Sequence, residues 1–311
     1  MSIRTNAEVG PRVSVLVPVY QSEETLRAFL EALELQTVQD FETIAVDSSP
    51  GDACMRILAR FPRVRAIRSA GRLWPHQART RGVAESRAPW LVFTDPDVVP
   101  APDWLERMLA TAEAGDPVVG ALGCVGDRWL DRAVHLCKFS KWLPGRPASE
   151  VDMGPTANVA VARADFETVE GFGSERLLGD VELSRRLHGL GRTLRFASGA
   201  VVDHHHTHTF GSFLKERFVR GIDAGRYRSV HETGARHWAV LIGSLLMPVR
   251  CASNLVHCAR HAVEAGWMKS YVLGFPVVAL GFAGSVLGEA VGLVMGPAPE
   301  MEAGEAAPAV R

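Results

Sequence analysis

Apolar runs of strand length alternate with helix-like segments through the first third of the chain, and this alternation restricts the fold more than any other feature. Between the runs, apolar residues recur every three or four positions, as in Leu26, Phe29, Leu30 and Leu33. Such alternation predicts a three-layer α/β fold with a mostly parallel sheet and right-handed crossovers. The predicted strands are VSVLVPVY (13–20), FETIAVD (41–47), VRAIRS (64–69) and WLVFTD (90–95), and the predicted helices begin at Ser22, Asp52 and Pro75.

The alternation continues less regularly beyond residue 100. We expect further strands at PVVGALGCV, ANVAVA and FASGAVVD, helices over 103–114 and 180–190, and irregular structure over 126–152. The chain then divides into a flexible leader at 1–11, a globular α/β domain at 12–232, an apolar helical region at 233–297 and a disordered tail at 298–311 that is rich in Pro, Ala and Glu.

Composition excludes several classes of protein. The 311 residues are 47% hydrophobic, which suffices for a large core, and the formal net charge of −1 gives no general attraction to nucleic acid. The five cysteines form no CxxC pair, so we expect reduced thiols. The opening MSIRTNAEVGPR lacks the apolar core of a signal peptide, which predicts a cytosolic location for the α/β domain.

Two apolar segments, Trp238–Cys258 and Tyr271–Met295, are long enough to span a bilayer. Arg250 and Glu289 lie inside them, and a central Arg costs about 2.5–3.5 kcal/mol on insertion scales. The alternative is a helical pair packed on the α/β domain or on a second subunit. If the segments span, they form a hairpin, and the basic residues of 215–236 keep the α/β domain on the cytoplasmic face.

Polar residues follow several of the predicted strands at what should be one edge of the sheet. The clearest case is LVFTDPDVVP (91–100), where Asp95 and Asp97 end a buried strand. Ligands of open α/β sheets bind at that edge, and two such carboxylates suit Mg²⁺ or Mn²⁺ bound to a diphosphate. The alternative is a simple turn, since Asp-Pro is frequent in loops.

The order of the motifs resembles that of family-two glycosyltransferases of the GT-A fold, over about residues 12–230. The motifs that carry this resemblance are VSVLVPVYQSEETL, AVDSSPGD, ARTRG, FTDPD and LLGDVELSRRL. It implies a GT-A-type nucleotide-diphospho-sugar transferase fold followed by an apolar helical hairpin. It also implies an enzyme that transfers a hexosyl group, with a role in cell-envelope polysaccharide synthesis.

The resemblance also implies roles for single residues. Pro18, Tyr20 and Glu24 match the segment that contacts the nucleotide of the sugar donor, and Asp47 matches the aspartate that accepts from its base. Arg79 matches the arginine of the family's ARN stretch. Asp95 and Asp97 match its DXD motif, with Asp97 as the direct metal ligand, and Asp180 matches the general base.

The predicted base has a structural alternative and a changed neighbour. Asp180 could instead cap the helix that follows it. Gly179 stands where the family usually has glutamate, at an acceptor-contacting position, and SSPGD replaces the more frequent DGSTD, which leaves the donor sugar open.

Two further features of the sequence have alternative readings. The resemblance implies that a histidine of DHHHTH, either His204 or His206, approaches the metal or diphosphate. A zinc hydrolase site is not expected there because no HExxH or Cys pair accompanies the cluster. Trp104 could stack on the acceptor sugar, as in similar transferases, or belong to the core.

The sequence therefore predicts an inverting, divalent-metal-dependent glycosyltransferase that moves a sugar from a nucleoside diphosphate to a hydroxyl acceptor, lipid-linked or membrane-proximal. Inversion follows from a single displacement with one base, and the base contributes roughly 10²–10⁴ in rate. The alternatives are a nucleotidyltransferase, which would need a basic, Gly-rich loop absent from PVYQSEETL, and a non-catalytic protein that binds nucleotide sugars. Sugar, linkage and oligomeric state are not determined by the sequence.

Overall fold

The computed structural model describes residues 10–112, 114–172, 178–231, 238, 242 and 246–297. They form two compact units. The first consists of the described parts of Met1–Ala121, Ala148–Gly173 and Asp180–Asp203, and the second of the described parts of Leu122–Pro147, Ser174–Gly179 and His204–Arg311. The predicted leader and tail fall almost entirely outside the described residues.

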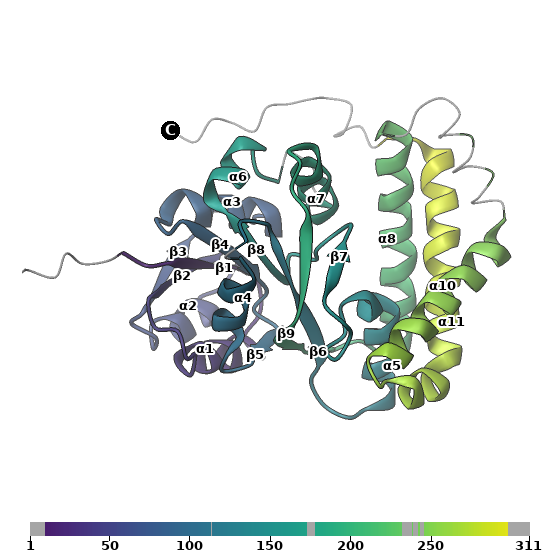
Figure 1. Cartoon of the computed structure of the whole chain (residues 1–311), viewed down its shortest axis with the longest axis horizontal. Helices are drawn as coiled ribbons and strands as arrows, with labels where there is room; N and C mark the ends of the chain where they lie inside the picture. Colours follow the sequence, from purple (N-terminus) through teal and green to yellow (C-terminus); the bar gives the residue numbers. More distant parts are fainter. Residues whose placement is uncertain are drawn as a thin grey trace, which may run out of the picture. The chain divides into compact units, whose positions relative to one another are not determined.

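A mixed nine-stranded sheet forms the centre of the first unit, in the order β3-β2-β1-β4-β8-β6-β9-β5, with β7 paired to β9 (Figure 1). The strands are β1 (Val13–Val19), β2 (Phe41–Asp47), β3 (Val64–Arg68), β4 (Trp90–Thr94), β5 (Val98–Pro100), β6 (Val118–Cys124), β7 (Ser149–Val151), β8 (Asn158–Ala162) and β9 (Leu194–His204). The four strands expected from the opening alternation are confirmed to within two residues.

The parallel part of this sheet places the predicted site at one edge. Strand β1 pairs in parallel with β2 and with β4, and β2 pairs in parallel with β3. Val19 lies opposite Asp47, so β1 and β2 end together. Strand β8 runs antiparallel to both β4 and β6. The loops after β1, β2 and β4 therefore leave the sheet at the same edge, as the sequence predicts for a ligand-binding edge.

Helices of the first unit form because their apolar residues share one face. Helix α1 (Leu26–Glu34) buries Leu26, Phe29, Leu30 and Leu33, the residues that predicted it. The other helices that contribute to this unit are α2 (Ala53–Leu58), α3 (Pro75–Glu85), α4 (Trp104–Ala112), α6 (Arg163–Thr168) and α7 (Gly179–Gly189). Helix α3 begins with Pro75, which favours the first helical position.

The expectation of irregular structure over 126–152 is wrong. Helix α5 (Trp129–Phe139), the short 3₁₀ helix η1 (Ser140–Trp142) and strand β7 occupy much of this segment. Helix α5 buries Ala133, Val134, Leu136 and Cys137. Small and charged residues dilute that apolar face in the sequence, and only the partners it packs against make the helix favourable.

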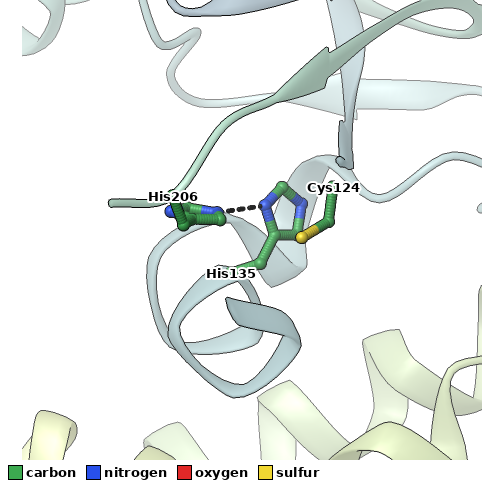
Figure 2. Close-up of side chains that lie close together, drawn as sticks. All are labelled: Cys124, His135 and His206. Carbon is green, nitrogen blue, oxygen red and sulfur yellow. Dashed lines mark hydrogen bonds between the residues drawn. The ribbon is translucent and has the colours of Figure 1, made fainter. Parts of the chain in front are cut away.

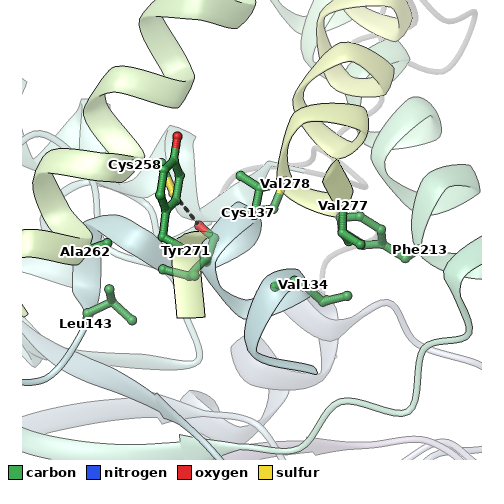
Figure 3. Close-up of a cluster of buried hydrophobic side chains, with 11 residues drawn as sticks. Val134, Cys137, Leu143, Phe213, Cys258, Ala262, Tyr271, Val277 and Val278 are labelled. Carbon is green, nitrogen blue, oxygen red and sulfur yellow. Dashed lines mark hydrogen bonds between the residues drawn. The ribbon is translucent and has the colours of Figure 1, made fainter. Parts of the chain in front are cut away.

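The second unit is helical, and its core gathers residues that are far apart in the sequence. It consists of α5, η1, α8 (Phe210–His231), α10 (Met247–Glu264) and α11 (Met268–Met295). Figure 3 shows its buried cluster, in which Val134 and Cys137 of α5 lie near Phe213 of α8, Cys258 of α10 and Val278 of α11. The five cysteines form no disulfide bonds, as the sequence predicts.

Helices α8 and α11 approach so closely that their backbones touch. A Cβ atom added at Gly288 would lie 2.1 Å from the carbonyl oxygen of Phe218, and one at Gly292 would lie 2.1 Å from that of Ile222. On α8, Gly221 and Gly225 are equally tight against α11. Pairs of glycines four residues apart on both helices therefore allow this contact, because any side chain would overlap the backbone of the other helix.

Of the two predicted membrane segments, one is long and apolar enough to cross a bilayer in the described residues. Helix α11 meets that criterion, and half of its most apolar stretch is buried within the protein. Most of the described part of the other segment, from Met247 on, lies in α10, which carries Arg250, His257 and Arg260. Glu289 of α11 is buried and binds Arg228 at 2.5 Å and Arg250 at 2.7 Å, so its charge is paired.

Candidate active site

The two aspartates of the DPD motif lie in the turn between β4 and β5, immediately after a strand whose last four residues are buried. The core position of β4 is thus confirmed. Pro96 separates the two residues and disfavours a helical backbone at Asp95. The turn therefore presents two carboxylates at the edge of the sheet where the loops after β1 and β2 also begin.

A buried arginine beneath this turn holds its backbone and one of its carboxylates. Arg79 on α3 is 2% exposed, and its guanidinium donates to Asp95 Oδ1, to the carbonyl of Thr94 at 3.3 Å and to the carbonyl of Thr156 at 3.4 Å. The planar, multiply donating guanidinium suits such a convergence of acceptors. One side chain thereby connects α3, the end of β4 and the start of β8.

Electrostatics gather three carboxylates around the same arginine. Burial lowers the pKa of the Arg79 guanidinium, and this is opposed first by Asp95, then by Asp180 and Asp97. We call these four residues the Arg79 carboxylate group. With its carboxylates ionised, it carries three negative charges and one positive charge, an imbalance that favours a cation. Three residues predicted separately, as metal ligands and base, therefore belong to one electrostatic site.

Asp47 lies at the end of β2 with no exposed surface. Its Oδ1 accepts from the backbone N–H of Ser49 at 2.9 Å, and its Oδ2 accepts from Arg68 at 3.0 Å. Arg68 also lies 3.4 Å from Asp52. Both oxygens of the carboxylate thus have protein partners, one of which is Arg68. The predicted contact between Asp47 and a nucleotide base stays a prediction.

Tyr20, just after β1, takes part in an aromatic and cationic stack that sequence reasoning missed, with Arg72 and Trp74 from the segment between β3 and α3. The Arg72 guanidinium lies over Tyr20 at 4.5 Å and over Trp74 at 4.7 Å from the ring centroids. Gln21, with φ 49°, is tied to the next loop through its N–H to Ser49 Oγ. The signal lay in the polar and aromatic loop residues around GRLW, but only the fold brings them beside Tyr20.

The remaining residues of the predicted nucleotide segment differ in exposure. Pro18 is buried inside β1, and Glu24 is exposed just before α1. Of these two residues, only Glu24 is accessible to a ligand in solvent, whereas Pro18 is part of the buried strand. Their predicted contacts with the nucleotide stay predictions.

Helix α7 begins at Gly179, one residue before the predicted base. Asp180 therefore lies in the first turn of α7 rather than at its N-cap. Asp180 Oδ1 accepts from the N–H of Val181 at 3.0 Å. An acidic residue at a helix N-terminus is stabilised there by the helix dipole. Leu178 has φ 64°, a rare conformation for such a side chain, directly before buried Gly179. Catalytic and acceptor roles at 179 and 180 stay predictions.

The prediction that Trp104 stacks on the acceptor sugar is corrected by the structure. Trp104 has no exposed surface, and its Nε1–H donates to Asn158 Oδ1 at 2.9 Å. The amide of Asn158 in turn donates to the carbonyls of Ala121 and Ala200. The indole is a buried anchor for three strands, which is the core alternative.

The histidines predicted to approach the metal belong to the second unit. His204 ends β9 and is buried, and its ring stacks on that of His206 with centroids 4.8 Å apart. His206 is also buried and has His135 as its hydrogen-bond partner at 2.9 Å. The predicted role of either residue at the donor's metal stays a prediction.

We expect replacement of Arg79 with Met to destabilise the protein by about 3 kcal/mol, because it removes the buried partner of Asp95 and leaves three neighbouring carboxylates without a countercharge. Urea unfolding measures this. Arg107→Met is the control, since its exposed pair with Asp103 should contribute no more than about 1 kcal/mol. Equal losses in both variants would contradict the central role of Arg79.

Comparisons with known proteins find glycosyltransferases. Residues 14–157 match the model of Glycosyl transferase family 2. The chain is 27% identical over 220 residues to the glycosyltransferase AglE of Haloferax volcanii, covering 68% of this chain and 72% of that protein. It is 32% identical over 117 residues to an undecaprenyl-phosphate 4-deoxy-4-formamido-L-arabinose transferase of Photorhabdus laumondii, covering 35% of this chain and 36% of that protein.

The fold resembles that of solved GT-A enzymes. A mannosyltransferase from Pyrobaculum calidifontis, in complex with GDP-Man and Mn²⁺, superimposes with a TM-score of 0.59 at 17% identity, covering 92% of this chain and 88% of that one. At this identity the likeness concerns the fold. It agrees with the family match, which identifies residues 14–157 of the chain as a Glycosyl transferase family 2 segment.

Proposed function

We propose that this protein is an inverting glycosyltransferase that uses a nucleoside-diphosphate hexose and a divalent cation, Mg²⁺ or Mn²⁺. The observation that carries the proposal is the Arg79 carboxylate group, which gathers Asp95, Asp97 and Asp180 at the ligand-binding edge of the sheet. A structural ion pair would need one carboxylate for one arginine, whereas this group has three.

The donor atoms fit a hard cation. Carboxylate oxygens are the ligands that Mg²⁺ and Mn²⁺ prefer, and Asp97, with Asp95 beside it, would hold the ion. When bound, such an ion stabilises the charge that develops on the diphosphate leaving group. Asp95 is already fixed by Arg79, so its orientation does not depend on the ion. Asp97 is the residue whose change should alter metal-dependent binding most directly.

Asp180 is proposed as the base that accepts the proton of the acceptor hydroxyl. It lies close enough to Arg79 for their charges to interact. Its position in the first turn of α7 provides a fixed backbone. One base and a single displacement imply inversion at the anomeric carbon.

We expect Asp97→Asn to weaken binding of UDP or GDP strongly in Mn²⁺ and little in chelator, because the amide is a poorer ligand for a hard cation than the carboxylate. Calorimetry with each nucleotide, with and without Mn²⁺, measures this. Asp103→Asn is the matched control, since Asp103 is paired on the surface with Arg107. Unchanged Mn²⁺-dependent affinity in Asp97→Asn would refute the metal assignment.

We expect Asp180→Asn to lower kcat by roughly 10²-fold or more with donor affinity nearly unchanged, because the amide cannot accept a proton. The assay is single-turnover release of nucleoside diphosphate from the donor that the calorimetry selects. A near-normal kcat would leave Asp180 with a structural role only. A wild-type protein that binds the donor without transfer would instead favour the non-catalytic alternative.

We further propose that the acceptor is lipid-linked and that the protein lies on the cytoplasmic face of a membrane. One relative is named for transfer to undecaprenyl phosphate, a lipid carrier. In the second unit, two rows of apolar residues are exposed, each with a spacing of seven that keeps them on one helix face. They are Leu273, Leu280, Leu287 and Val294 on α11, which we call the α11 stripe, and Val249, Val256 and Val263 on α10.

Surface attachment fits these helices better than a span. The other side of α11 packs along α8, with backbone contact at Gly288 and Gly292. Helix α8 carries Lys215, Arg217, Arg220 and several further charges, so α11 cannot enter the hydrocarbon core without them. An amphipathic pair lying in the interface buries the stripe and leaves α8 in water.

We expect the variant Leu280→Glu/Leu287→Glu to lose binding to vesicles of phosphatidylglycerol and phosphatidylcholine, because two charges would enter the acyl boundary. Flotation of the full-length protein with vesicles measures this. The control is Val219→Glu/Val230→Glu, which makes the same change at exposed positions of α8. A wild-type protein that stays unbound and forms a stable dimer would reassign the stripe to a protein interface.

A further inference from the structure

Three residues whose side chains can bind metals lie close together in the second unit. They are other residues than the carboxylates described above, and they offer nitrogen and sulfur atoms rather than oxygen. Cys124 ends β6, His135 lies on α5, and His206 follows β9 (Figure 2). One potential ligand atom of each lies within 4.8 Å of those of the other two. His135 and His206 are buried, whereas Cys124 is partly exposed and offers a route from solvent.

The hydrogen bonds of His135 prepare it as a ligand. Its Nε2 lies 2.9 Å from the carbonyl oxygen of Leu122, which can only accept, so Nε2 carries the ring proton. The lone pair of Nδ1 therefore points toward Nε2 of His206, 2.9 Å away. Metal-binding histidines almost always donate their other ring N–H to such a carbonyl, which fixes tautomer and orientation.

His206 completes the pair and has an unexplained atom. Its Nδ1 is buried and has no hydrogen-bond partner among the described residues, although the side chain is only 8% exposed. The nitrogen of His206 that faces His135 is Nε2, so Nε2 is the atom that would bind the ion, and the ring proton would then lie on Nδ1. Burial lowers the pKa of both rings, that of His135 to about 3.

We propose that Cys124, His135 and His206 form a zinc site. One thiolate and two imidazoles are the soft and borderline ligands that Zn²⁺ accepts in tetrahedral geometry, and three protein ligands leave the fourth position to water. With Zn–N bonds of about 2.0–2.1 Å and a Zn–S bond of about 2.3 Å, tetrahedral ligand atoms lie about 3.3–3.6 Å apart. The two nitrogens, 2.9 Å apart, would have to separate slightly to reach this spacing.

The exchange on binding is simple. Cys124 loses its thiol proton to solvent as its sulfur binds zinc. His135 already has its proton on Nε2, and His206 stays neutral because its single ring proton moves to whichever nitrogen does not bind. Zinc therefore takes the place of the proton between the two rings, and that proton stays on the other nitrogen of His206. The proton released, about one per ion at neutral pH, comes from the thiol of Cys124.

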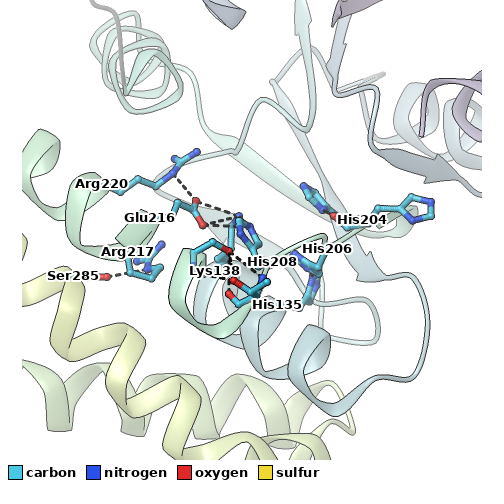
Figure 4. A network of polar contacts seen from close by, with 12 residues as sticks. His135, Lys138, His204, His206, His208, Glu216, Arg217, Arg220 and Ser285 are labelled. Atoms are coloured by element: carbon cyan, nitrogen blue, oxygen red, sulfur yellow. Dashed lines mark hydrogen bonds and ion pairs between the residues drawn. The ribbon is translucent and has the colours of Figure 1, made fainter. Parts of the chain in front are cut away.

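The surrounding charges permit this cation. Lys138 on α5 is the nearby positive group, and Glu216 of α8 lies 3.2 Å from its Nζ, with His208 at 3.4 Å from Glu216 (Figure 4). Glu216 and Lys138 thus pair with each other, and the bound thiolate offsets one of the two charges of zinc. The site would join the end of β6, α5 and the segment after β9.

The test uses the full-length Asp97→Asn variant, so that ions held by the DPD turn do not contribute. After removal of metal with a chelator, zinc is titrated against a chromophoric competitor, and calorimetry in two buffers counts the protons. We expect one zinc per chain with sub-micromolar Kd and release of about one proton. Substitution with Co²⁺ should give the near-ultraviolet absorption of a thiolate-to-metal transition.

Cys124→Ser should weaken zinc binding on the order of 100-fold or more and abolish that absorption. Cys251→Ser, at another partly exposed free cysteine, should change neither. His206→Asn provides an independent ligand variant, and circular dichroism checks that each variant is folded. Absence of stoichiometric zinc, or equal affinity in a folded Cys124→Ser or His206→Asn variant, would overturn the proposal. Nucleotide binding by the wild type is a separate readout and does not affect this outcome.

Discussion

The contact between Arg79 and Asp95 is the interaction on which the arrangement of the site depends. A buried guanidinium is tolerated only where acceptors and negative charge surround it, and here they come from three parts of the chain. In return, the arginine fixes the turn that carries the two aspartates. The same charge attracts Asp180, which follows about 85 residues later in the sequence. One side chain, Arg79, thus both fixes the turn after β4 and sets the charge around its two aspartates.

Two different kinds of polar cluster occur in the chain. Around Arg79 the donors are carboxylate oxygens at the sheet edge, which favour hard cations. In the second unit the donors are two buried imidazoles, whose pKa values burial lowers, and the sulfur of Cys124. The chemistry of each set selects a different class of ion, so binding at one should not substitute for binding at the other.

Sequence patterns predicted what depends on local spacing. The strands at 41–47 and 13–20, the buried face of α1 and the position of the DPD turn follow from apolar periodicity and turn residues, and all are found. The helix α5 was missed because two of its buried residues, Asp131 and His135, are polar and hide its apolar face in the sequence. Trp104 was open to two readings, since an indole serves a core or a sugar equally well until its surroundings are known.

The sequence by itself determined the α/β order, the reduced cysteines and the carboxylates that carry the family resemblance, because these are properties of composition and of short-range spacing. Only the tertiary structure decided that Arg79 lies among Asp95, Asp97 and Asp180, and that His206 meets His135 and Cys124. It also decided that glycines let α8 and α11 touch. These outcomes depend on contacts between residues tens of positions apart, whose partners are chosen by sheet pairing and helix packing rather than by local propensity.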